Sequence, residues 1–298
     1  MVLPSPLFGV AGFPPNFFCS EFGKKRENIF AWLNHIGLDW IELQNTYGVK
    51  MKDDQARLYR NYSEQYNIGI SIHGPYYISL ASRDRDVVAR SRERILQCIH
   101  LANILKSSRI IFHPGYCGGR TIEDRQSGIK QLVEELLVLK DDMPKGMYLY
   151  PETAGKKAQL GSLNEIMQIC DAVDFARPCL DLAHIHGFEG GSLRTERDIS
   201  NVFEIVANRF GKDYLQDLHI HMYPVDYDHN GEKKHKAFSD YVDNNLSGAS
   251  GIAACELYHP QANHFISVLK KTDISPVIIC EARDTQDAGA LLMKELLG

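Results

Sequence analysis

Short apolar segments rich in β-branched and aromatic residues recur along the chain, with starts about 30 to 40 residues apart except before the last one. Such segments are typical of buried strands. We expect strands at residues 8–12, 40–43, 69–73, 109–113, 147–152, 178–181, 218–221 and 276–281. Between them, apolar residues recur at helical spacing, most clearly at residues 87–106, 123–140, 163–172, 196–210 and 261–271. Thr121 followed by Asp124, and Ser162 followed by Glu165, are typical of helix starts.

The alternation of strands with helices predicts a parallel sheet with right-handed crossovers. Eight such units in 298 residues fit an α/β fold of the (β/α)8 TIM barrel type, for which about 250 residues is typical. A doubly wound open sheet is the alternative, but no G-x-G-x-x-G motif follows the first strand. We expect one domain, residues 1–298, with an elaborated loop at about residues 222–251.

The composition excludes several classes of protein. Hydrophobic residues make up 44% and charged residues 24% of the chain, which is enough apolar material for a large core and excludes a disordered chain. The net charge of -5 excludes a globally basic nucleic-acid binder, although not a locally basic face. No apolar run approaches the roughly 20 residues of a membrane span. Seven scattered cysteines without a C-x-x-C motif indicate reduced thiols and a cytoplasmic protein.

The last six expected strands all finish in histidine, aspartate or glutamate. In a barrel these carboxyl ends gather at one mouth, where active sites lie. The residues are His73, His113, Glu152, Asp181 with His184, His219 with His221, and Glu281. Each alone fits a structural role, such as a hydrogen-bonded histidine or a helix cap. Together they would be costly to bury without a neutralising cation, and their mixture of imidazole and carboxylate favours zinc, iron or manganese over calcium.

The motifs at these strand ends resemble those of the endonuclease IV family of apurinic/apyrimidinic endonucleases, which are xylose isomerase-like barrels. They follow the family order over about 210 residues. The stretches are HGPYYISLAS at 73–82, FHPG at 112–115, PETAG at 151–155 with LG at 160–161, CLDLAH at 179–184, HIH at 219–221, GEKKH at 231–235 and IICE at 278–281.

The resemblance implies a TIM barrel that binds two or three zinc ions, with manganese or iron as other candidates. The implied ligands form three groups: His73, His113 and Glu152; Glu152, Asp181, His219 and Glu281; and His184 with His235. Glu152 would bridge two metals and act as the catalytic carboxylate. His219 occupies the family's ligand position by register, while His221 lies on the same strand face by the period of two and competes for the role.

Two departures from the family pattern affect the expected site. The family has an aspartate two residues before the second histidine of the third group, where this chain has Lys233. Glu232, Asp226 or Asp228 could replace that carboxylate, and Lys233 could instead contact a substrate phosphate. Residues 44–51 do not match the family's DNA-contacting loop, whereas Tyr76 occupies the position of a DNA-contacting tyrosine.

The resemblance implies hydrolysis of double-stranded DNA on the 5′ side of abasic sites, in base excision repair. The alternative is a sugar isomerase or epimerase on the same barrel, in which one divalent metal is held by the second ligand group and a small sugar is the substrate. The additional imidazoles of the other groups favour the nuclease. The net charge and the unmatched loop favour the isomerase.

Overall fold

The computed structural model describes residues 5–238, 258–272 and 274–298. Eight parallel strands form one sheet in the order β5-β4-β3-β2-β1-β10-β7-β6. Their bounds are β1 (Leu7–Ala11), β2 (Trp40–Gln44), β3 (Gly69–His73), β4 (Arg109–Phe112), β5 (Tyr148–Pro151), β6 (Cys179–Asp181), β7 (His219–His221) and β10 (Val277–Cys280). Isolated bridges from Leu149 to Ala176 and from Glu152 to Cys179 join the two ends of the sheet. The barrel is therefore nearly closed, which confirms the predicted fold and excludes the open sheet.

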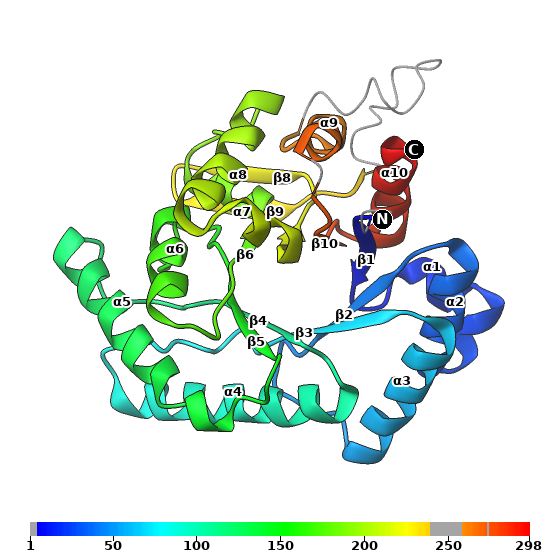
Figure 1. The fold of residues 1–298 in the computed structure, drawn as a ribbon, viewed down its shortest axis with the longest axis horizontal. Coiled ribbons are helices and arrows are strands. Elements are labelled where there is room, and N and C mark those ends of the chain that lie inside the picture. The colour runs from blue at the N-terminus through cyan, green and yellow to red at the C-terminus, as the bar shows by residue number, and fades with distance from the viewer. Residues whose placement is uncertain (1–4, 239–257, 273) are drawn as a thin grey trace.

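Helices surround the strands (Figure 1). They are α1 (Pro15–Cys19), α2 (Ile29–Ile36), α3 (Asp53–Tyr66), α4 (Arg85–Leu105), α5 (Ile122–Leu137), α6 (Leu163–Ala172), α7 (Leu182–Phe188), α8 (Glu196–Phe210), α9 (Ala262–Thr272) and α10 (Gln286–Leu297), with 3-10 turns at Glu21–Lys24, Arg26–Asn28, Lys140–Asp142 and Lys212–Asp217. Thr121 with Asp124, and Ser162 with Glu165, form capping boxes at the starts of α5 and α6, as predicted. No helix among the described residues is both long and apolar enough to cross a membrane.

The strands divide their side chains between an apolar exterior and a mostly polar interior. Ile41, Ile72 and Ile220 belong to the large core between the sheet and the helices. A small separate cluster of Ile111, Tyr150 and Cys179 lies inside the barrel. Because side chains alternate along a strand, the remaining inward positions hold buried histidines and carboxylates. The interior is thus a polar chamber that opens at the carboxyl ends of the strands.

The segment after β7 contains an antiparallel hairpin of β8 (Val225–Asp228) and β9 (Gly231–His235). This hairpin occupies part of the elaborated loop expected at residues 222–251. Residues 239–251 of that prediction lie outside the described residues. The hairpin contacts α7, so it covers one side of the barrel mouth.

Candidate metal centre

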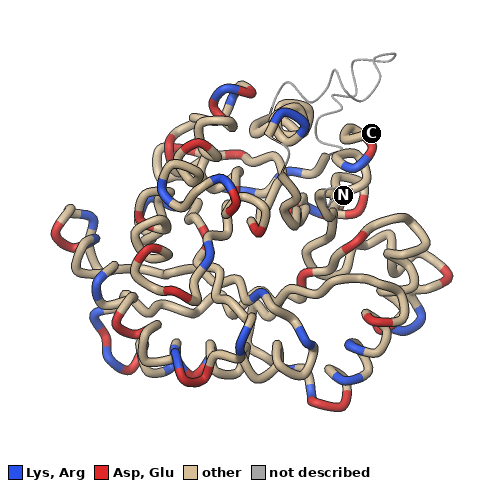
Figure 2. Tube along the Cα trace, viewed as in Figure 1, with Lys and Arg blue, Asp and Glu red and all other residues tan. Residues whose placement is uncertain are grey.

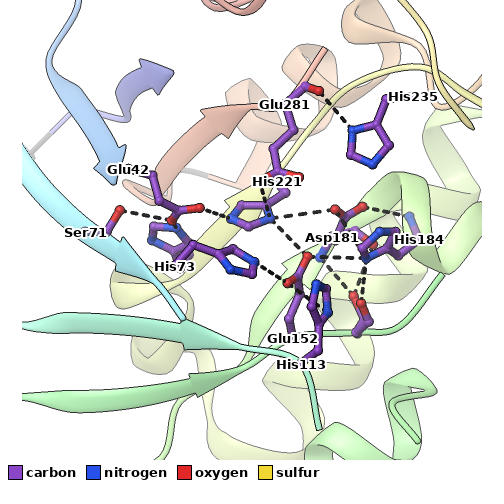
Figure 3. A network of polar contacts seen from close by, with 12 residues as sticks. Glu42, Ser71, His73, His113, Glu152, Asp181, His184, His221, His235 and Glu281 are labelled. Atoms are coloured by element: carbon purple, nitrogen blue, oxygen red, sulfur yellow. Dashed lines mark hydrogen bonds and ion pairs between the residues drawn. The ribbon is translucent and has the colours of Figure 1, made fainter. Parts of the chain in front are cut away.

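Histidines and carboxylates from six strands converge at the mouth of the barrel (Figure 3). Each comes from the last residue of a strand or from the first residues after it, where the backbone leaves the sheet and side chains can turn inward. Three groups have candidate ligand atoms within 4.8 Å of one another: His73, His113 and Glu152; Glu152, Asp181, His221 and Glu281; and His184, Glu232 and His235. The structure therefore brings together most of the residues expected from the sequence.

Glu152 lies between the first two groups, and each of its oxygens faces one of them. Oε2 lies 3.1 Å from His73 Nε2 and 3.3 Å from His113 Nδ1. Oε1 lies 3.1 Å from His221 Nδ1. The Glu152 side chain is completely buried. This geometry is the one that a carboxylate needs to bridge two cations.

His221, and not His219, completes the second group. The Nδ1 atom of His221 lies 3.7 Å from both Asp181 Oδ2 and Glu281 Oε1. His219 instead points its Nε2 at Glu42, 2.8 Å away. His219 starts β7 and His221 ends it, so His219 lies one layer deeper in the barrel, too far from the mouth to join the group. We therefore replace His219 by His221 as the candidate ligand on this strand.

The third group contains Glu232, one of the three carboxylates considered from the sequence. Its Oε2 lies 3.0 Å from His184 Nε2 and its Oε1 lies 3.1 Å from His235 Nε2. Residues three apart on a regular strand face opposite sides, but the pairing of β8 with β9 shifts at Asp226 and leaves Lys233 unpaired. This bulge brings Glu232 and His235 to the same face. The departure at Lys233 is thus an inserted position and not a lost carboxylate.

Gly155 allows β9 to approach this closely. Its carbonyl accepts a hydrogen bond of 2.8 Å from the Glu232 N–H, and a Cβ at this position would clash with the Glu232 side chain. The glycine of the PETAG stretch is therefore required by the fold of the third group.

Unpartnered buried atoms indicate that the arrangement suits cations. His113 Nδ1 and Asp181 Oδ2 are buried and form no hydrogen bond among the described residues, although both face other candidate ligands. Buried polar atoms normally have partners. A divalent ion with nitrogen and oxygen ligands would satisfy them, and the donor set suits zinc, iron or manganese.

The carboxylates determine the protonation of the metal-free site. Burial lowers the pKa of His73, but the facing Glu152 carboxylate outweighs this effect and raises it to about 9. Burial likewise opposes Glu232 at His235, whose pKa is also raised to about 9. Burial dominates at His113 and lowers its pKa to about 4. Burial would raise the pKa of Glu152, but the surrounding imidazoles hold it well below its usual range.

A cavity of about 270 Å³ lies over the groups. Tyr76 and Lys233, the two residues expected to contact substrate, both line it, together with Lys156 and Gln159. The sequence argument missed Glu42, a completely buried carboxylate on β2. Its signal was a lone charge inside the apolar strand WIELQ, since a buried charge needs partners.

Comparison with known families matches residues 30–297 to the xylose isomerase-like TIM barrel. The chain belongs to this family. It is 29% identical to an uncharacterized protein of Methanocaldococcus jannaschii over 288 residues, 97% of this chain and 96% of that protein. It is 31% identical to a probable endonuclease 4 of Thermoplasma acidophilum over 173 residues, which span 57% of this chain and 58% of that relative.

Solved structures of two activities share the fold. Endonuclease IV of Thermus thermophilus has a TM-score of 0.64 at 14% identity, with 99% of each chain covered. A D-psicose 3-epimerase of Clostridium cellulolyticum has a TM-score of 0.61 at 13% identity, with 97% of each chain covered. At these identities the likeness concerns the fold alone, so the choice between activities depends on the site.

Proposed function

We propose that the protein is a metal-dependent phosphodiesterase of the endonuclease IV type, which cleaves double-stranded DNA 5′ to abasic sites. The observation that carries the proposal is the presence of three candidate ligand groups, two of them joined by Glu152. A sugar isomerase of this fold needs only the second group. The additional imidazoles of the first and third groups have a use in phosphodiester hydrolysis, where several cations share the charge of the phosphate.

The residues at the mouth have distinct roles in this proposal. A bound divalent ion, zinc or else manganese or iron, would polarise a phosphoryl oxygen and lower the pKa of a water molecule. Glu152 keeps the first two groups at a fixed separation. Lys156 and Lys233 line the cavity and offer positive charge to the phosphate. Tyr76, whose side chain is 47% exposed, offers a ring to the adjacent sugar or base.

Exposed tyrosines on two sides of the mouth support a polynucleotide substrate. Four tyrosines are exposed in the described part of the chain, namely Tyr47, Tyr76, Tyr77 and Tyr116. The last three line a groove of about 440 Å³ with Arg90 and Arg94, and Tyr47 lines one of about 300 Å³ with Arg26 and Lys50. Both grooves share residues with the central cavity. Rings that stack on bases, beside cations for phosphates, are typical of nucleic-acid grooves.

The cationic contribution is local. Lys and Arg alternate with Asp and Glu along the outer helices (Figure 2), and the net charge is -5. Binding therefore depends on the grooves at the mouth and not on a basic face of the whole molecule.

The decisive experiment is incision of a duplex oligonucleotide that carries one tetrahydrofuran abasic analogue. With zinc present, we expect a single cut on the 5′ side of the analogue that leaves a 3′ hydroxyl. The same duplex without the analogue is the control and should stay intact. An intact abasic strand, with the metal sites filled, would contradict the proposal.

A sugar epimerase is the second candidate, because Glu152, Asp181, His221 and Glu281 by themselves make up the four ligands that such an enzyme uses. Metal content separates the two functions. About three ions per chain at saturating zinc support the nuclease. One ion per chain, together with turnover of a ketose, supports the epimerase.

Metal binding is expected to strengthen as the pH rises from 7 to about 9. The pKa values of His73 and His235 are raised to about 9 in the metal-free protein, so both imidazoles carry a proton at pH 7 that must leave before Nε2 can bind a metal. Each proton released adds about tenfold in apparent affinity per pH unit. Competition with a chelator at several pH values measures this slope, and a flat profile between pH 7 and 9 would refute it.

Glu232→Gln is expected to weaken binding at the third group alone, because it removes the charge that His184 and His235 face. Stepwise chelation should release one metal from this variant at a chelator concentration at least about tenfold lower than from the wild type. Lys233→Gln is the matched control, since Lys233 is the neighbouring exposed residue, and it should retain all its metals. Early release from both variants would remove Glu232 from the ligand set.

A further inference from the structure

Glu42 lies beneath the candidate ligands and belongs to none of the groups assigned above. Its completely buried carboxylate is surrounded by donors from three strands. Ser71 Oγ donates to Oε2 at 3.0 Å and Gln44 Nε2 donates to Oε1 at 3.1 Å. His219 Nε2 lies 2.8 Å from Oε2, and His221 Nε2 lies 3.2 Å from Oε1. So many partners hold this carboxylate in one orientation.

The other well-partnered imidazoles of the site are oriented by backbone carbonyls. Nδ1 of His73 contacts the carbonyl oxygen of Gly74 at 3.0 Å. Nδ1 of His184 contacts that of Thr153 at 2.8 Å, and Nδ1 of His235 contacts that of Glu281 at 3.0 Å. A carbonyl only accepts, so in each case Nδ1 carries the hydrogen and Nε2 faces the candidate metal position.

His221 is turned the other way. Its Nδ1 faces Glu152, Asp181 and Glu281. Its Nε2 forms no hydrogen bond to any other described group, and Glu42 is the acceptor in front of it. A carboxylate is the only group here that can take the Nε2 hydrogen and leave the Nδ1 lone pair for a metal.

We propose that Glu42 is the positioning residue of the second ligand group: it selects the Nε2–H form of His221 and so directs Nδ1 at the metal. Gln44 extends this control, because its Nε2 also donates to Glu281 Oε1 at 3.3 Å. His219 then has a role in this chain as a donor that fixes Glu42 from below, and Trp40, which donates to Ser71 at 3.1 Å, fixes it from the side. The inference rests on the proposed metal centre and deepens it.

The test compares zinc affinity at the second group, measured by competition with a chelator, in the wild type and in Glu42→Gln. The amide keeps the shape of the side chain but replaces one acceptor oxygen with a donor nitrogen. We expect affinity at this group to fall about 10- to 100-fold, with the other sites unchanged. Glu135→Gln is the matched control, because Glu135 is a buried carboxylate paired with Arg92 on the outer helices. It should keep wild-type affinity.

Two further measurements separate positioning from a general structural effect. In a His221→Ala background, Glu42→Gln should change zinc affinity less than about twofold, because its route to the metal is gone. In the zinc-loaded wild type labelled with ¹⁵N-histidine, the ring hydrogen of His221 should be on Nε2. This spectrum needs no variant, so it decides the case even if Glu42→Gln does not fold.

Several outcomes would overturn the inference. One is zinc affinity in Glu42→Gln equal to that of Glu135→Gln, and another is a His221 ring hydrogen on Nδ1. An undiminished effect in the His221→Ala background would show that Glu42 acts elsewhere. If the wild type takes up no zinc at all, the proposed function fails together with this inference. If zinc binds and only the Glu42 effect is absent, the proposed function stands and the inference alone fails.

Discussion

Glu152→Gln is expected to remove at least one metal and to lower turnover by a factor on the order of 10³. The reason is the division of its two oxygens, one facing His73 and His113 and the other facing His221. The amide replaces one of these oxygens with a nitrogen that cannot bind a cation. It also leaves the imidazoles without the charge that compensates a proton or a metal at this depth.

Metal content per chain and incision of the abasic duplex measure this effect. Glu135→Gln again serves as the control for the loss of a buried carboxylate, and it should retain both metal and activity. Normal metal content with near-normal incision in Glu152→Gln would show that the carboxylate does not bridge the groups. Normal metal content with lost incision would restrict its role to the reaction itself.

The strand pattern alone carried the fold and most of the site. Period-two apolar segments located β3 at residues 69–73, and they located the other strands to within about two residues. Because parallel strands of a barrel end at one mouth, His73, Glu152 and Asp181 could be expected to meet although about 30 to 80 residues separate them. Chain order and strand period are enough for that inference.

Features that depend on depth and on irregular backbone could not be predicted in the same way. His219 and His221 share a strand face, so the period cannot say which lies at the mouth, and that depends on the stagger of β7 against β6 and β10. Glu232 reaches the face of His235 only because of a bulge, which changes the spacing from two residues to three. Glu42 comes from β2, whose visible signal is a single charge, and its partners come from β2, β3 and β7.

His221→Ala is expected to empty the second group, whereas His219→Ala should keep its metal with affinity lowered by at most about tenfold. His221 Nδ1 lies within 3.7 Å of Glu152, Asp181 and Glu281, so its loss removes a ligand. His219 contacts Glu42 alone among these carboxylates. Burial lowers the pKa of His219 to about 4, so at pH 7 it is neutral and removes no charge when replaced.

The two variants also differ in how they affect folding. His219→Ala leaves a cavity and takes one donor from the buried Glu42 carboxylate, which should lower the free energy of unfolding by about 1–3 kcal/mol. Zinc content measured beside denaturant unfolding separates a lost ligand from a destabilised chain. If His219→Ala loses the metal and His221→Ala retains it, the ligand on β7 is His219, and Glu42 must then act on the metal through the deeper of the two histidines.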